Sequence, residues 1–125
     1  MDGGRTPLEH APAVHLRREP FSEVARDLGS LVPAGVCANP YCSKDFVPVR
    51  AWSKYCCDAC RRMDDKEHRA FGHRVAPAML AWISGRHAGG GTVRGDLSSA
   101  GRRFYTNAAS EWRKDREARA KAVRG

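Results

Sequence analysis

All five cysteines of the 125-residue chain fall within one stretch of sequence, at Cys37, Cys42, Cys56, Cys57 and Cys60. Thiolates are preferred ligands of zinc, which takes four ligands in a tetrahedron, often as two pairs from separate segments. Cys37 and Cys42 form one pair, and the turn-forming dipeptide Asn39-Pro40 between them can fold their sulfurs together. The stretch therefore predicts one structural Zn2+ with no coordination position left open for water.

The second pair of ligands ends at Cys60 and begins at either Cys56 or Cys57. The separation of two residues between Cys57 and Cys60 is common in zinc fingers, whereas Cys56 lies one residue further away. A helix is expected to begin here, and backbone amides and the helix dipole at a helix start stabilise thiolate charge. The spacing alone leaves both assignments open.

The surroundings of the cysteines favour metal binding over disulfides. The first twenty residues contain no apolar stretch of signal-peptide length, and the longest apolar run, Val75 to Ile83, is too short to span a bilayer. We therefore expect a soluble cytoplasmic protein without membrane contact. Thiols stay reduced in that compartment and are available to a metal.

The hydrophobic pattern predicts a mostly α protein with a small zinc-binding module made of a short β-hairpin and a helix. The hairpin is expected in "DFVPVRAWSKY" and the helix after Cys60. Four parts are expected along the chain: a disordered lead-in (1–19), a short helix (20–35), the zinc module with its helix (36–75), and a C-terminal helical pair with a basic tail (76–125).

The C-terminal pair is predicted from two apolar segments. Pro77 is expected to kink the zinc-module helix or to open a new one, and a glycine-rich linker follows. The last helix is expected to begin at Asp96, Ser98 or Ser99. Its stripe of Phe104, Ala108 and Trp112 should dock on the preceding helix, and the charged residues beyond are expected to fray.

Two segments of the cysteine stretch resemble a known group of zinc fingers. "CANPYCSKDF", with Phe46 four residues after Cys42, and "KYCCDACRR", with the step Tyr55-Cys56, are similar to treble-clef fingers of the MYM and CGNR types. The resemblance covers about residues 37–62 and nothing outside them. It implies a treble-clef-like module.

The resemblance also implies a ligand set, which consists of Cys37, Cys42, Cys56 and Cys60, with Cys57 as the alternative to Cys56. Cys57 stands where the pattern usually has serine, a residue that would cap the helix start. The Gly-Asn-Arg that follows the last cysteine in CGNR-type fingers is replaced by Arg61-Arg62. This departure weighs against a specific CGNR-type function.

The charge of the chain favours an anionic partner. Lys and Arg number 22 against 14 Asp and Glu, a formal net charge of +8, and such a balance suits nucleic acid. Arg62, Lys66 and Arg69 share one face of the expected helix. The predicted nucleic-acid contacts are Arg50, Lys54, Arg61, Arg62, Lys66 and Arg69. The basic tail could track phosphates as well.

Other functions fit parts of the same pattern. The basic face of the expected helix could simply be exposed to solvent, with the ion pairs Asp58/Arg62 and Asp65/Arg69. The module could also be a protein-interaction adaptor, or the C-terminal helices could pair with a second copy to form a homodimer. An HNH-like nuclease needs a histidine base, and no histidine lies between the cysteine pairs. We therefore expect a non-enzymatic zinc-finger protein that binds DNA or RNA and acts as a small regulator.

Overall fold

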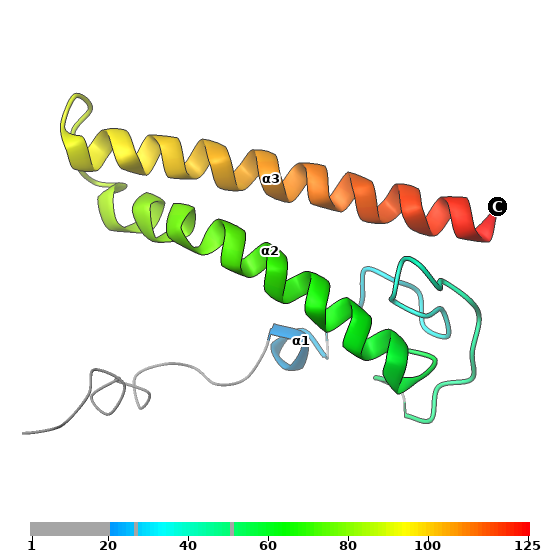
Figure 1. Ribbon diagram of the computed structural model, residues 1–125. Helices are drawn as coiled ribbons and strands as arrows, with labels where there is room; N and C mark the ends of the chain where they lie inside the picture. The colour runs from blue at the N-terminus through cyan, green and yellow to red at the C-terminus, as the bar shows by residue number, and fades with distance from the viewer. Residues whose placement is uncertain (1–20, 27, 51) are drawn as a thin grey trace, which may run out of the picture. The chain divides into compact units, whose positions relative to one another are not determined.

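The computed structural model describes residues 21–26, 28–50 and 52–125, and the predicted lead-in of residues 1–19 lies outside them. It contains α1 (Phe21–Val24), α2 (Asp58–Gly85) and α3 (Val93–Arg124) (Figure 1). The chain divides into two compact units, residues 1–31 and 32–125. In the described part of the chain, no helix combines the length and apolar character needed to cross a bilayer.

Among the described residues of the first unit, α1 is the only helix. The helix predicted over residues 20–35 is present only as the four residues Phe21–Val24, so this prediction was wrong for most of its length. Gly29, at a φ of 126°, adopts a conformation outside the helical region. Pro33 further along also disfavours a helix, because it has no amide hydrogen to donate.

The second unit is built on α2 and α3, which lie side by side and antiparallel (Figure 1). The segment with the cysteines lies at the end of the pair where α2 begins and α3 ends. Val75 of α2 and Ala108 of α3 are buried between the helices, and the rings of Trp82 and Tyr105 lie 5.9 Å apart. The expected docking of the last helix is thus confirmed.

The division predicted between residues 75 and 76 is not found, because α2 runs without interruption through Pro77. The proline cannot donate a hydrogen bond to the carbonyl of His73, and that loss normally disfavours a helix interior. Contacts with α3 lie on both sides of it: Val75 is buried, and the carbonyl of Trp82 accepts a hydrogen bond of 2.7 Å from Ser98 Oγ. This packing offsets the lost backbone bond.

The start of α3 differs from the predicted position. Thr92 is the N-cap, and its Oγ1 accepts a hydrogen bond of 3.0 Å from the amide of Gly95. The predicted cap Asp96 lies in the first turn, and the predicted cap Ser98 is buried against α2. The helix also continues through the tail to Arg124 rather than fraying after Trp112.

No strand is present among the described residues, so the predicted hairpin in residues 45–55 is not formed there. A single antiparallel bridge joins Val36 and Asp45. The C-terminal end of residues 45–55 bonds to the residue after Cys37 instead: the carbonyl of Lys54 accepts a hydrogen bond of 2.8 Å from the amide of Ala38. Pro48 also removes an amide that a hairpin ladder would use.

The close contact of α2 and α3 depends on a glycine, and this makes a testable prediction. A Cβ built on Gly101 would lie 2.3 Å from the carbonyl oxygen of Ala78, whereas one built on the exposed Gly72 meets nothing within 4 Å. Gly101→Ala should therefore lower the free energy of unfolding by about 1–3 kcal/mol through overpacking.

In the matched control variant, the free energy of unfolding is expected to change in the opposite direction. Gly72→Ala should raise the free energy of unfolding by about 0.5–1 kcal/mol, because alanine has the higher helix propensity and gains it without a clash. Urea titration followed by far-UV circular dichroism measures both variants. Equal stabilisation by the two substitutions would show that the helices are not in close contact at Gly101.

Candidate metal centre

Four cysteine sulfurs lie together at the start of α2. The Sγ atoms of the cluster are all within 4.8 Å of one another, and they belong to Cys37, Cys42, Cys56 and Cys60. The Sγ–Sγ distances from Cys56 to Cys42 and from Cys56 to Cys60 are both 3.7 Å. A tetrahedral ion with metal–sulfur bonds of about 2.3 Å requires sulfurs about 3.8 Å apart. The cluster is therefore consistent with one bound metal ion, and an all-sulfur set suits zinc.

The first pair of sulfurs is held by a tight turn, as the sequence predicted. Asn39 is buried, and its carbonyl accepts hydrogen bonds of 2.9 Å from the amides of Cys42 and Ser43. Its side-chain Oδ1 accepts another, of 3.1 Å, from the amide of Tyr41. The amide of Cys37 closes the loop on the carbonyl of Lys44 at 2.9 Å. We call residues 37–45 the knuckle.

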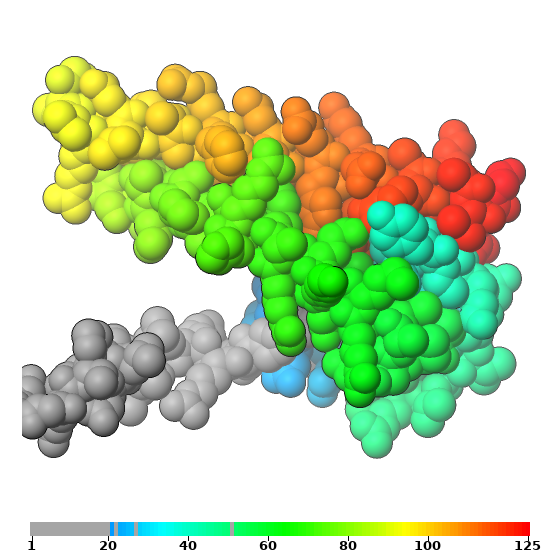
Figure 2. All heavy atoms as spheres, in the orientation of Figure 1, coloured from blue at the N-terminus to red at the C-terminus, as the bar shows by residue number. Residues whose placement is uncertain are grey.

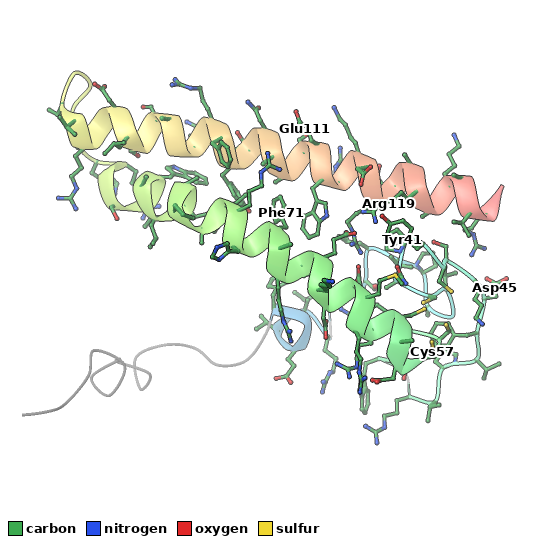
Figure 3. All side chains as sticks on the ribbon, viewed as in Figure 1. Tyr41, Asp45, Cys57, Phe71, Glu111 and Arg119 are labelled. Carbon is green, nitrogen blue, oxygen red and sulfur yellow. The ribbon has the colours of Figure 1, made fainter. Side chains whose placement is uncertain are left out.

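The second pair comes from the start of α2. The amide of Cys56 lies 3.5 Å from Cys37 Sγ, which ties the two halves of the cluster together. Cys57 is the N-cap residue of α2, as the resemblance implied, and its thiol makes no capping hydrogen bond. Its exposed Sγ is 3.8 Å from Cys56 Sγ and lies outside the group of four (Figure 3).

Behind the cluster lies a buried carboxylate. The side chain of Asp64 is 1% exposed and accepts hydrogen bonds from Tyr55 Oη at 2.6 Å and from Arg116 Nη1 at 2.7 Å. Arg116 Nη2 also donates to the knuckle carbonyl of Ala38, at 3.3 Å. Burial, together with the bond to Asp64, raises the pKa of Tyr55 above its ordinary value of 10.0. One guanidinium thus joins α3, α2 and the knuckle.

One turn further along α2, Glu67 makes a second set of contacts with α3. Arg119 binds it through two hydrogen bonds of 2.7 and 3.0 Å, and Trp112 Nε1 donates a third at 2.9 Å. These hydrogen bonds, that of Arg119 foremost, hold the pKa of Glu67 at about 2, below its ordinary 4.5. The guanidinium of Arg119 also lies 4.6 Å from the centroid of the Tyr41 ring in the knuckle (Figure 3).

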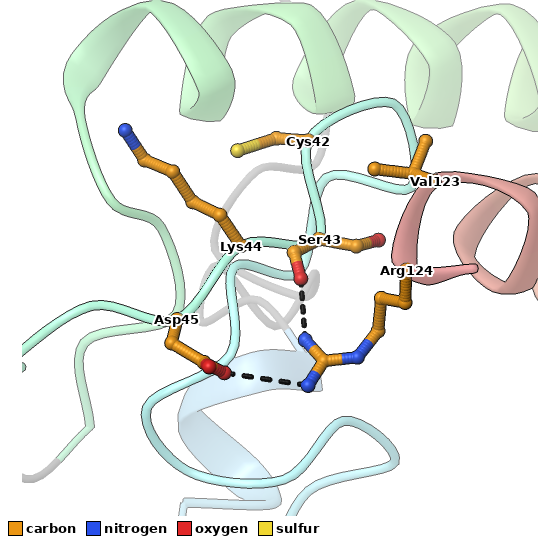
Figure 4. A pocket seen from close by; sticks show the side chains of 6 residues that line it. All are labelled: Cys42, Ser43, Lys44, Asp45, Val123 and Arg124. Carbon is orange, nitrogen blue, oxygen red and sulfur yellow. Dashed lines mark hydrogen bonds and ion pairs between the residues drawn. The ribbon is translucent and has the colours of Figure 1, made fainter.

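The last turn of α3 contacts the knuckle directly. Arg124 donates a hydrogen bond of 2.5 Å to the carbonyl of Ser43, and its other terminal nitrogen lies 3.4 Å from Asp45 Oδ1 (Figure 4). An open pocket lies between the two segments, and its lining residues are Cys42, Ser43, Lys44, Asp45, Val123 and Arg124. The prediction that the charged residues beyond Trp112 fray was therefore wrong for Arg116, Arg119 and Arg124, which these contacts hold in place.

The predicted nucleic-acid contacts differ in their surroundings. Arg61 pairs with Asp58 at 2.6 Å and with Asp65 at 3.2 Å. The predicted pair of Asp58 with Arg62 is confirmed, at 2.7 Å. The exposed residues of the set also include Arg50, Lys54, Lys66 and Arg69. Four of the six predicted contacts belong to α2, whereas Arg50 and Lys54 belong to the loop before it.

The sequence contained a signal for the arginine network that the sequence analysis did not use. Asp64 and Glu67 are three residues apart on α2, and Arg116 and Arg119 are three residues apart on α3. Residues with this separation share a helix face. Two acidic side chains on one helix and two basic ones on another, in matching register, are typical of helices that pair.

Comparison of the chain with models of known families, with curated proteins and with solved structures finds no match. The four-cysteine cluster is accordingly the observation that bears on the resemblance to treble-clef fingers. Its four cysteines are positioned like a metal site, and no family match assigns a type of finger.

Proposed function

We propose that this is a non-enzymatic zinc-finger protein that binds DNA or RNA, with one structural Zn2+ in a treble-clef-like module. The four thiolates would fill the tetrahedron of the ion, so the metal would hold the fold and carry out no reaction. A helix that begins at such a site is held rigidly at its first turn. It is therefore suited to present side chains to a partner.

The observation that carries the proposal is the outer face of α2. Arg62, Lys66, Arg69 and His73 recur at helical spacing and are all exposed, while the buried Asp64 and Val75 lie on the opposite face, toward α3. Figure 2 shows that the side chains of α2, in green, form a surface that α3 leaves uncovered. A row of cations on an uncovered helix matches the phosphates of a nucleic-acid backbone.

Removal of two cations from this face tests the proposal. Lys66→Ala combined with Arg69→Ala should weaken binding to duplex DNA at low salt. It should also reduce the slope of log K against log salt by about 1.8, because each phosphate contact contributes about 0.9. Fluorescence anisotropy over a range of salt concentrations measures both quantities on the zinc-loaded protein.

The control removes the same two residue types from α3. Arg103 and Lys114 are exposed and lie on the side of α3 away from α2, so Arg103→Ala combined with Lys114→Ala should leave the slope nearly unchanged. An equal effect of both double variants would show that net charge, rather than the face of α2, determines binding. Absence of binding at low salt would favour the alternative, a zinc-containing adaptor for another protein.

A further inference from the structure

The loop before α2 exposes apolar side chains beside cations. Val47, Val49 and Trp52 are 90%, 93% and 50% exposed. The basic residues Lys44, Arg50 and Lys54 lie within three positions of them in the sequence and are exposed as well. Apolar side chains at such exposure lose the gain from burial. Phosphate contacts along α2 would not explain why these apolar side chains of the loop are exposed. The loop therefore points to a ligand with both flat apolar and anionic parts.

The loop holds its aromatic residue in a defined position. A turn is closed by a hydrogen bond of 2.9 Å from the amide of Ser53 to the carbonyl of Arg50, and Ser53 Oγ accepts a bond of 3.2 Å from the amide of Arg50. The Arg50 guanidinium lies 5.8 Å from the centroid of the Trp52 ring. Beyond the turn, Lys54 is tied to the knuckle through Ala38. An indole held in this way loses little conformational freedom when a ligand stacks on it.

We propose that Trp52 stacks on a base of single-stranded nucleic acid, while Arg50 and Lys54 contact the phosphates on either side. This inference rests on the proposed function and names its ligand class. The bases of a duplex are already stacked on one another, so only a single strand can offer a base to the indole. Every base has a flat apolar face, and stacking on an aromatic side chain is the usual way in which proteins hold single strands.

The experiment uses the full-length, zinc-loaded protein and measures anisotropy with three labelled probes at low salt. The probes are an oligo-dT and an oligo-U of about 15 nucleotides, which cover the usual site size, and a DNA duplex of the same length. Trp52→Ala should weaken binding to both single strands by about 5- to 150-fold, the range for loss of one stacked base. Trp52→Phe should keep most of the affinity for the single strands, and neither variant should change the affinity for the duplex.

Two outcomes separate this inference from the proposed function. If the variant Lys66→Ala with Arg69→Ala weakens binding while Trp52→Ala has no effect on any probe, the stacking role is overturned and the nucleic-acid function stands. If the protein binds none of the three probes, both fail. Sedimentation with phosphatidylserine vesicles is run in parallel. Binding to vesicles that depends on Trp52, without binding to the single strands, would overturn the inference in favour of a lipid surface.

Discussion

A Cys42→Ser protein is expected to lose stoichiometric zinc and the folded knuckle. Its Sγ is one of four that lie within 4.8 Å of one another, and hydroxyl oxygen is a far poorer zinc ligand than thiolate. Structural zinc sites contribute about 10–16 kcal/mol of apparent binding free energy in finger peptides, so the loss of one ligand should abolish the cooperative melting transition of the module. Metal analysis of the purified protein and thermal melting measure the effect, and Cys56→Ser should behave in the same way.

The adjacent cysteine provides the control. Cys57 is exposed and is the N-cap of α2 without a capping hydrogen bond. Cys57→Ser should therefore keep one zinc per chain and raise the free energy of unfolding by up to about 1 kcal/mol, because a serine hydroxyl caps a helix well. Loss of zinc from Cys57→Ser, with zinc retained in Cys56→Ser, would reverse the ligand assignment.

Removal of the Arg116 guanidinium is expected to be the most destabilising change outside the cysteines. Arg116→Met keeps the length and apolar stem of the side chain but leaves the carboxylate of Asp64, 1% exposed, without its cationic partner. Loss of one member of a buried ion pair costs about 3–5 kcal/mol. Urea titration of the zinc-loaded protein should show a decrease of that size in the free energy of unfolding.

A nearby arginine on the same helix separates this effect from a change in net charge. Arg113 lies 3.8 Å from Glu117, and both side chains are 67% exposed, so Arg113→Met should cost less than about 1 kcal/mol. Asp64→Asn in the Arg116→Met background should recover part of the loss, because it removes the buried charge. Equal costs for the two methionine variants, without recovery, would show that Asp64 is not buried against Arg116.

Local chemistry made the cysteine cluster and the first turn of α2 predictable. The turn at Asn39-Pro40 and the position of Cys57 at the helix start depend on residues within a few positions of one another. Pairing between distant segments was harder to infer. The bond from Ala38 to Lys54 takes the place of the predicted hairpin, and packing on α3 carries α2 through Pro77. Both outcomes depend on contacts that the local sequence pattern does not contain.

The tail illustrates the same difficulty through its charge. A run of arginines near the end of a chain is usually solvated, and the sequence offers no local partner for it. Arg116 and Arg119 find their partners on α2, about fifty residues earlier in the chain. Only the matching register of acidic residues on α2 could have indicated that pairing. The same contacts explain why α3 stays helical to Arg124.

The contact between Arg124 and Ser43 also sets an order of events during protein synthesis. The two residues are 81 positions apart, so the ribosome releases all of the cysteines well before it adds the arginine. Chains fold from the N-terminal end as they emerge. The four cysteines of the proposed metal site can therefore come together first, and the last turn of α3 packs on the knuckle only afterwards.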